Sequence, residues 1–183
     1  MDADAVRVSK TDKVFYPDDE ITKGDVIEHY RAVADVLVPH LRGRPLTLRR
    51  FPDGITGEGF FQKEASDYFP DWIRVHTVPQ RGDASASVHH VVCEDAATLV
   101  YLVNQATIEF HIWSSTVDNL GNPDLMVIDL DPPEEAECPD LRRIARRVRD
   151  LFDDLGLCPF LQATGGRGFH VVAPLDASAD FDT

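Results

Sequence analysis

The sequence predicts an α/β fold, and three observations lead to this prediction. Apolar segments typical of β-strands recur along the chain, amphipathic segments with helical spacing lie between them, and the two kinds alternate in the second half. With 183 residues the chain is long enough for one sizeable core. Because we find no internal repeat and no obvious linker, we expect a single domain over residues 1–183.

The first half of the chain begins with a helix. We expect Thr22 to be its N-cap, because Asp25 follows three residues later in the spacing of a capping box. The helix should end between Pro39 and Gly43. Strands are expected at 45–51, 57–63, 72–78, 88–92 and 108–113, with a short helix at 95–104.

The clearest pattern lies in the second half. An apolar strand at 125–130 is followed by an amphipathic helix at about 139–155, which Gly156 closes, and by strands at 159–163 and 169–173. The apolar segment FHVVAPL is followed by only eight residues, too few to cover it with another element. We therefore expect a chain that is truncated at its C-terminus.

Composition narrows the class of protein. The chain has 43% hydrophobic and 27% charged residues and no low-complexity tract, which is typical of globular proteins. No apolar run approaches the roughly 18–20 residues that span a bilayer, and the start lacks the apolar core of a signal peptide. We therefore expect a cytoplasmic protein with no membrane partner. Three scattered cysteines without CxxC spacing predict no disulfide framework and no zinc site, and we expect them to be reduced and structural.

The charge distribution bears on nucleic-acid binding. A net charge of −14 argues against nonspecific coating of nucleic acid, because phosphate binding depends on Lys and Arg. The basic residues are clustered, however, so a local patch could still bind DNA. The arginines of the 139–155 helix lie opposite its apolar stripe and are most simply a solvated face. The other clusters are Lys10, Lys13 and Lys23, and Arg42, Arg44, Arg49 and Arg50.

LMVIDLDPP, at 125–133, places two carboxylates at the end of a strand with an otherwise buried pattern. Asp129 and Asp131 are two residues apart and should share a face, where like charges are costly unless a positive group lies between them. Such a pair can hold Mg²⁺ or Mn²⁺ and leave coordination positions for substrate phosphates. An Asp-x-Asp also occurs as a turn former and in phosphoryl-transfer hydrolases, so the pair alone leaves these alternatives open.

ATGGRGFHVV, at 163–172, predicts a turn whose backbone N–H groups face an anion. Thr164, Arg167 and His170 would add side-chain donors. The segment is not a Walker loop, since it has no GKS or GKT. The alternative is a glycine-rich hairpin with a histidine that faces the core.

GFFQK, at 59–63, contains two adjacent aromatic residues. In a strand Phe60 and Phe61 must point to opposite faces, so one of them could be exposed beside basic residues as a platform for a base. The alternative is that both rings lie in the core. His111 could line a pocket together with Trp113, although a core histidine is the simpler interpretation.

Taken together, these motifs resemble the polymerase domain of bacterial ligase D, a branch of the archaeo-eukaryotic primase superfamily. The resemblance covers nearly the whole chain, and the motifs follow the order of the family. It implies a primase-polymerase-like domain with a central mixed sheet flanked by helices. The matching segments are KVFYP at 13–17, ITKGD at 21–25, HLRGRPLTLRRFPDGI at 40–55, GFFQK, Trp113, NPDLMVIDLDPP at 122–133 and TGGRGFHVVAPL at 164–175.

The resemblance implies residues for metal and nucleotide binding. Asp129 and Asp131 match the first catalytic motif, which holds two divalent metal ions, Mn²⁺ or Mg²⁺. His111 matches a residue near the sugar of the nucleotide. The second motif, which grips the nucleotide triphosphate, is matched by Thr164, Gly165, Gly166, Arg167 and His170.

The resemblance also implies residues for DNA binding. Lys13 and Lys23 match lysines that recognise a 5′-phosphate on the downstream strand. Phe60 and Phe61 match aromatic residues that stack against template bases at a gap or break.

The implied function is a template-dependent nucleotidyltransferase that fills gaps and extends ends with NTPs or dNTPs in non-homologous end joining. Its implied partners are DNA ends and gaps with a 5′-phosphate, an ATP-dependent DNA ligase and Ku, and its implied location is the nucleoid.

Two departures from the family are visible. Thr164 stands where the family more often has serine, which keeps the hydroxyl. The third metal-binding aspartate of the family follows the second motif on a later strand, and Asp176, Asp180 and Asp182 lie too near His170 to match it. A catalytically incomplete module that binds 5′-phosphorylated DNA ends is therefore an alternative, and an unrelated metal-dependent phosphohydrolase is a further one.

Overall fold

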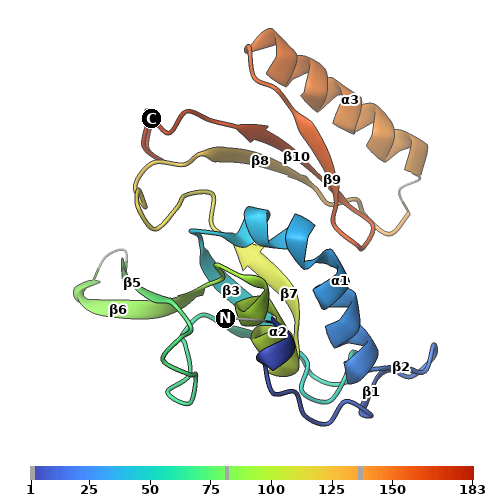
Figure 1. Ribbon diagram of the computed structural model, residues 1–183. Helices are drawn as coiled ribbons and strands as arrows, with labels where there is room; N and C mark the ends of the chain where they lie inside the picture. The colour runs from blue at the N-terminus through green and yellow to red at the C-terminus, as the bar shows by residue number, and fades with distance from the viewer. Residues whose placement is uncertain (1–2, 81–82, 136–137) are drawn as a thin grey trace. The chain divides into compact units, whose positions relative to one another are not determined.

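The computed structural model describes residues 3–80, 83–135 and 138–183 and confirms the predicted α/β class. The chain divides into two compact units, Met1–Trp113 (unit 1) and Ser114–Thr183 (unit 2), shown in Figure 1. None of the described helices is both long enough and apolar enough to cross a membrane.

Unit 1 is built around strand β3. This strand pairs with β4, β6 and β7, and β5 extends the sheet from β6, while β1 and β2 form a separate pair. The elements of unit 1 are a 3-10 helix at Ala3–Ala5, β1 (Val14–Tyr16), β2 (Ile21–Thr22), α1 (Lys23–Leu41), β3 (Pro45–Arg50), β4 (Phe60–Gln62), β5 (Val75–Gln80), β6 (Asp83–Val92), α2 (Ala96–Asn104) and β7 (Thr107–Ile112).

Helix α1 starts where its capping residues predict. The Thr22 hydroxyl accepts a hydrogen bond from the Asp25 N–H (3.2 Å), and the Asp25 carboxylate accepts one from the Thr22 N–H (2.8 Å), which completes the capping box. The helix ends at Leu41, within the predicted range, so Pro39 lies in its last turn.

The core of unit 1 orients β3. Leu46 and Leu48 are buried in one cluster with Ile27 of α1 and Leu99 of α2. Because side chains alternate along a strand, Thr47 and Arg49 point to the face of the sheet opposite these leucines. The helices therefore leave one face of β3 available for polar side chains.

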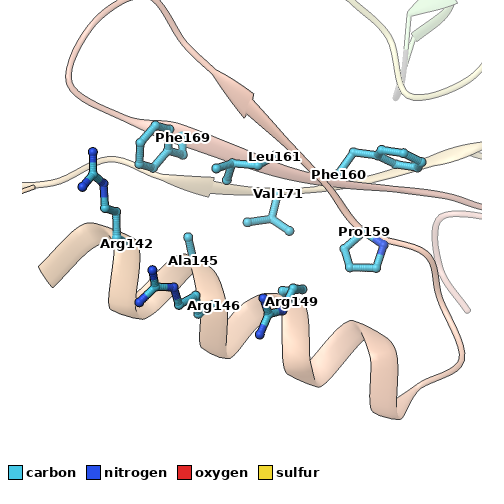
Figure 2. Close-up of a pocket in the computed structure, with 9 residues that line it drawn as sticks. All are labelled: Arg142, Ala145, Arg146, Arg149, Pro159, Phe160, Leu161, Phe169 and Val171. Atoms are coloured by element: carbon cyan, nitrogen blue, oxygen red, sulfur yellow. The ribbon is translucent and has the colours of Figure 1, made fainter. Parts of the chain in front are cut away.

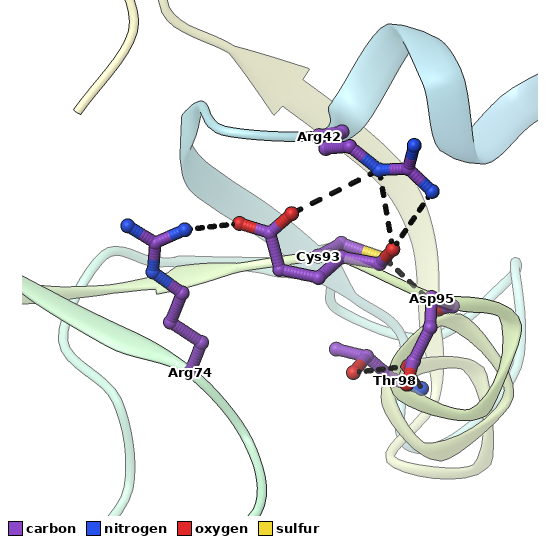
Figure 3. A network of polar contacts seen from close by, with 6 residues as sticks. Arg42, Arg74, Cys93, Asp95 and Thr98 are labelled. Carbon is purple, nitrogen blue, oxygen red and sulfur yellow. Dashed lines mark hydrogen bonds and ion pairs between the residues drawn. The ribbon is translucent and has the colours of Figure 1, made fainter. Parts of the chain in front are cut away.

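A polar network joins the end of β6 to both helices (Figure 3). Arg42 follows α1 and donates through Nε and Nη2 to the Glu94 carbonyl oxygen (3.3 and 3.2 Å), while the Glu94 carboxylate pairs with Arg74. Asp95 caps α2 by accepting a hydrogen bond from the Thr98 N–H (2.8 Å). These contacts anchor both helices to the sheet.

Cys93 lies inside this network and is fully buried, with its thiol 3.6 Å from the Asp95 carbonyl oxygen. Burial, followed by the nearby Asp95 carboxylate, raises the pKa of Cys93 to about 12. Cys138 and Cys158 are exposed, so the structural role expected for all three cysteines holds only for Cys93.

Unit 2 is a split βαβ arrangement. Its elements are β8 (Leu125–Leu130), α3 (Cys138–Asp154), β9 (Phe160–Ala163) and β10 (Phe169–Pro174). The sheet order is β8-β10-β9, and β10 is antiparallel to both neighbours. Within this sheet β10 lies between β8 and β9, and the described strands of the chain form three sheets in which each pairing is antiparallel.

Helix α3 covers the sheet of unit 2 from one side, where Ala145 and Phe152 pack against Val171 and Ala173 of β10. Val127 of β8 is 43% exposed, and Asp129 is also exposed. The interpretation of β8 as a buried core strand is therefore wrong, because its apolar residues are only partly covered.

Gly168 joins the loop after β9 to the end of β8. Gly168 is buried, and a Cβ atom added there would lie 2.7 Å from the Leu130 carbonyl oxygen. Only glycine permits this close approach of two backbones. The glycine-rich loop is thereby held against the residue that lies between Asp129 and Asp131.

We predict that Gly168→Ala destabilises the fold by about 1–3 kcal/mol, because the added methyl group has to displace backbone rather than a flexible side chain. Urea unfolding followed by circular dichroism measures the change. Gly166→Ala is the matched control, because a Cβ atom at Gly166 would meet nothing closer than the Thr164 hydroxyl oxygen at 3.9 Å. Equal losses in both variants would contradict the role assigned to Gly168.

We also predict that a thiol reagent labels Cys138 and Cys158 in the native protein and labels Cys93 only after unfolding. The folded-state pKa of Cys93 lies above its ordinary value of 9.0, so the stability that this group contributes is present below pH 9.0 and is lost as pH rises toward about 12. Labelling kinetics with Ellman's reagent test the first statement, and urea unfolding at alkaline pH tests the second. Rapid native labelling of a Cys138→Ser, Cys158→Ser variant would contradict the assignment.

Candidate functional site

The polar face of the unit 1 sheet gathers side chains from three strands. In the ladder registers, Arg49 of β3 lies directly opposite Phe61 of β4 and Glu109 of β7, and Thr47 lies opposite His111. Residues directly opposite in antiparallel strands share a face. Arg49, Phe61, Glu109 and His111 therefore lie together on the face away from the core leucines.

Contacts between these four side chains define a cluster. Glu109 accepts a hydrogen bond from Arg49 Nη1 (3.0 Å) and lies 3.1 Å from His111 Nε2. The Phe61 ring meets the His111 ring edge to face, with their centroids 5.3 Å apart, and the Arg49 guanidinium lies 5.4 Å from the Phe61 centroid. Because His111 is exposed, the interpretation of it as a core histidine is wrong.

Both phenylalanines of β4 are exposed, Phe60 by 45% and Phe61 by 58%. Arg50 stacks over Phe60, with its guanidinium carbon 5.5 Å from the ring centroid. The alternative that both rings lie in the core is therefore excluded. Each ring instead contacts an arginine of β3. The rest of each ring on the short strand β4 remains exposed and can contact another molecule.

The predicted lysine pair lies elsewhere in unit 1. Lys13 donates to the Pro52 carbonyl oxygen and to the Asp53 carboxylate (2.9 Å). Lys23 is only 5% exposed, and its ammonium donates to the Ser9 carbonyl oxygen (2.6 Å) and to Asn104 Oδ1 (2.8 Å). Lys23 therefore ties the N-terminal segment to α2.

The environment of Lys23 is unfavourable for its positive charge. Burial lowers the pKa of Lys23, and the positive charges of Lys10 and Lys13 lower it further. The hydrogen bonds to Ser9 and Asn104 hold the ammonium in place against both effects.

In unit 2 the strand pairing brings Asp129 and His170 together. These residues are directly opposite on β8 and β10, and His170 Nε2 lies 3.5 Å from Asp129 Oδ1. The Asp129 side chain is 64% exposed and the His170 side chain 33% exposed. His170 therefore faces the carboxylate rather than the core, which rules out the core-histidine alternative.

Asp131 lies one residue beyond the end of β8 and is exposed. Carboxylate oxygens are the donors that Mg²⁺ and Mn²⁺ prefer, so Asp129 and Asp131 fit such an ion by chemistry. Among the residues that the structure describes, however, no three His, Cys, Asp or Glu side chains form a group that could hold a metal ion. The two aspartates supply only part of a coordination shell.

The glycine-rich loop is stabilised by its own residues. The Thr164 hydroxyl donates to the Gly168 carbonyl oxygen (3.1 Å) and accepts from the Gly166 N–H (3.4 Å), while Gly165 has a positive φ of 85°. Arg167 Nη2 donates to the carbonyl oxygens of Pro133 and Glu134. The loop is thus a tight turn that is also bound to the segment after Asp131.

An opening of about 390 Å³ adjoins this loop. Its lining includes Gly165, Gly166 and Arg167 together with Pro132, which follows Asp131. The predicted second motif and the end of the aspartate strand therefore border one cavity within unit 2.

Three residues of these sites were not predicted as functional. Arg49 had been recognised only as one of a basic cluster. Glu109 could have been found, because the alternation of IEFHIW places it on the same face as His111. Gly168 carries no local signal for its contact with Leu130, which depends on the pairing of β10 with β8.

Comparison with known proteins supports the resemblance. Residues 22–183 match the family model of the LigD primase-polymerase domain. The chain is 35% identical over 179 residues to the multifunctional non-homologous end joining DNA repair protein LigD of Mycobacterium tuberculosis (strain ATCC 25618 / H37Rv), and 33% identical over 174 residues to the bifunctional LigD of Bacillus subtilis (strain 168). These matches cover 93% and 95% of this chain but only 23% and 27% of the relatives. The chain thus spans about a quarter of the length of these relatives.

A solved structure agrees with the sequence matches. The polymerase domain from Mycobacterium tuberculosis ligase D in complex with DNA has a TM-score of 0.86 to this chain at 32% sequence identity. The similarity covers 93% of this chain and 61% of that one. With a family model that matches most of its length, the chain belongs to the LigD primase-polymerase domain family.

Proposed function

We propose that the chain acts in a template-dependent nucleotidyltransferase that fills gaps and extends DNA ends in non-homologous end joining. The observation that carries this proposal is the position of Asp129 opposite His170, beside a glycine-rich loop that Gly168 holds against the same strand end. Carboxylates for a metal ion and donors for a triphosphate then lie within one small sheet. In this proposal both units belong to one primase-polymerase-like domain.

Asp129 and Asp131 would hold Mn²⁺ or Mg²⁺. When bound, such an ion lowers the pKa of an attacking hydroxyl group and neutralises triphosphate charge. The chain's own contribution is positional: β8 ends between the two carboxylates, and the contact of Gly168 with Leu130 keeps the loop beside them.

Several residues would bind the incoming NTP or dNTP. Gly165 and Gly166 lie in an exposed turn, and the Gly166 N–H would exchange its long hydrogen bond to the Thr164 hydroxyl (3.4 Å) for one to a phosphate oxygen. His170 would add a donor beside Asp129, and Thr164 and Arg167 would shape the loop through the hydrogen bonds described above. His111, held by Glu109, would contact the sugar.

DNA would be recognised by unit 1. Lys13, which is partly exposed, and Lys23 would bind a 5′-phosphate through charge-assisted hydrogen bonds, as the resemblance implies. The exposed rings of Phe60 and Phe61 would stack against template bases. We further propose an ATP-dependent DNA ligase and Ku as partners at the nucleoid, as the resemblance implies.

A second candidate function is a DNA-end binding module without turnover. It is favoured by the two-carboxylate set of unit 2, because the described residues form no group of three metal ligands. The lysine cluster and the exposed phenylalanines belong to unit 1 and need no metal ion. End binding could therefore persist where catalysis does not.

We predict that the chain extends a primer across a short gap in the presence of Mn²⁺. Replacing both aspartates, as Asp129→Asn with Asp131→Asn, should lower the rate by at least about a hundredfold. The reason is that the loss of metal-binding carboxylates removes several kcal/mol of transition-state stabilisation. Asp118→Asn, an exposed aspartate of the same unit, is the matched control. Primer extension on gel and DNA binding by anisotropy are followed together. Binding without extension in the unmodified chain would favour the second candidate function, and extension that survives the double substitution would contradict the role of the aspartates.

We predict that Lys13→Ala weakens binding to a gap with a 5′-phosphate by roughly tenfold and changes binding to the unphosphorylated gap much less, because only the former loses a charge-assisted hydrogen bond. Lys63→Ala removes an equal charge outside the cluster and should affect both substrates alike. Fluorescence anisotropy with the two DNAs at one salt concentration measures the difference. Equal losses on both substrates for Lys13→Ala would contradict phosphate recognition.

Lys23 needs separate treatment because its ammonium holds backbone and Asn104 together. Lys23→Ala should also destabilise the fold, by about 1–3 kcal/mol, since it leaves buried acceptors unpaired. Urea unfolding of this variant separates the loss of stability from the loss of binding. An unchanged midpoint would contradict the structural role of Lys23.

A further inference from the structure

A second cavity of unit 2 shares Phe169 with the opening beside the glycine-rich loop and is lined by none of the aspartates or glycines of that site. It runs between α3 and β9, has a volume of about 380 Å³, and is shown in Figure 2. We call it the α3–β9 groove. The lining residues used below are Arg142, Arg146, Arg149, Leu161, Phe169 and Val171.

The groove has a basic wall and an apolar floor. Arg142, Arg146 and Arg149 recur at helical spacing, so they form one row along α3, and the described part of the lining contains no carboxylate. Figure 2 shows this row on the helix and the side chains of Leu161, Phe169 and Val171 on the strands that face it. The chain as a whole has a net charge of −14, so this row of positive charges beside an apolar surface is opposite in sign to the chain's net charge.

The arginines are available to a partner to different degrees. Arg149 already pairs with Asp150, at 2.6 Å. Within the described ranges 3–80, 83–135 and 138–183, no side chain forms an ion pair with Arg142 or Arg146, and both are exposed. Two guanidinium groups of the row are therefore free to bind carboxylates bidentately.

Strand β9 supplies the second feature of the groove. It pairs only with β10 among the described strands, so its outer edge presents unpaired backbone N–H and C=O groups. Its sequence, Phe-Leu-Gln-Ala, has neither a charged residue nor a proline to block pairing, and Phe160 and Leu161 are 60% and 59% exposed. An edge of this kind is a template for an added strand.

The row and the edge match in length. From Arg142 to Arg149 the helix rises about 10 Å at ~1.5 Å per residue. Four residues of β9 extend over about 10 Å at ~3.3 Å per residue. An extended segment added to β9 would thus place alternate side chains, about 7 Å apart, along the arginine row.

We propose that the α3–β9 groove binds an extended acidic polypeptide segment of a partner protein, which pairs with the outer edge of β9. Alternate carboxylates of the segment meet Arg142 and Arg146 on the α3 face, which Leu161 and Phe169 share, and the apolar side chains between them point to the other face of the sheet, where they cover Phe160. The free backbone groups along β9 suit another backbone, and this favours a peptide over a nucleic acid.

The test uses the 183-residue chain and a fluorescein-labelled synthetic peptide in which Glu alternates with Val. Binding is measured by anisotropy, and we expect Arg142→Glu with Arg146→Glu to weaken it by at least about tenfold, because both carboxylate contacts become repulsive. Arg143→Glu with Arg147→Glu is the matched control: it makes the same charge change on the same helix at positions outside the groove lining, and it should bind the peptide as the unmodified chain does. Circular dichroism melting of each variant checks that the fold is retained.

Two further probes separate the alternatives. A peptide that is N-methylated at every residue has no backbone N–H to donate to β9 and should not bind, and equal binding of this peptide would overturn the proposed edge pairing. Oligothymidylate of similar length should compete weakly. If oligothymidylate binds tightly and the double substitution abolishes this binding, the groove is a site for single-stranded nucleic acid. If the chain self-associates and the double substitution abolishes the association, the groove is a site for a second copy of the chain. Either result overturns the proposal.

Discussion

Antiparallel pairing of β10 with β8 is the constraint on which the rest of unit 2 depends. It sets His170 directly opposite Asp129, and it brings Gly168 against the Leu130 carbonyl oxygen with no room for a side chain. A slip of one residue would turn His170 to the opposite face of the sheet and would move the loop away from the aspartates. The chemistry of the candidate site therefore rests on one strand register and on the absence of one Cβ atom.

In unit 1 the constraint is different. Helices cover one face of the sheet, and polar and aromatic side chains are exposed on the other face. Leu46 and Leu48 direct β3 into the core, so Arg49 must lie on the opposite face, where it meets residues from both neighbouring strands. The resulting ion pair with Glu109 and the stacking on Phe61 hold groups that would otherwise move freely in solvent. Exposed aromatic rings are unfavourable in water, and such rings with cationic partners are useful as a surface that binds another molecule.

Burial of charge separates the two lysines that were predicted to act alike. Lys13 is partly exposed and held by a carboxylate, whereas Lys23 is buried, bonded to neutral acceptors and repelled by its basic neighbours. Lys23 thus contributes to folding through its hydrogen bonds. In unit 2, the arginines of α3 are exposed, as expected for a solvated helix face, and three of them line the α3–β9 groove.

Local signals in the sequence predicted most of the elements, but not the 3-10 helix or the short strands β1 and β2. The capping box at Thr22 predicted the start of α1, and the apolar run at 125–130 predicted the bounds of β8, because caps and periodicity act over a few residues. The order of the motifs also pointed to the family. Tertiary structure alone decided that Glu109 lies between Arg49 and His111, that both phenylalanines are exposed, and that Gly168 touches Leu130. Arg49 and Glu109 are 60 residues apart, and such contacts follow from which strands pair and in which register, which no local pattern encodes.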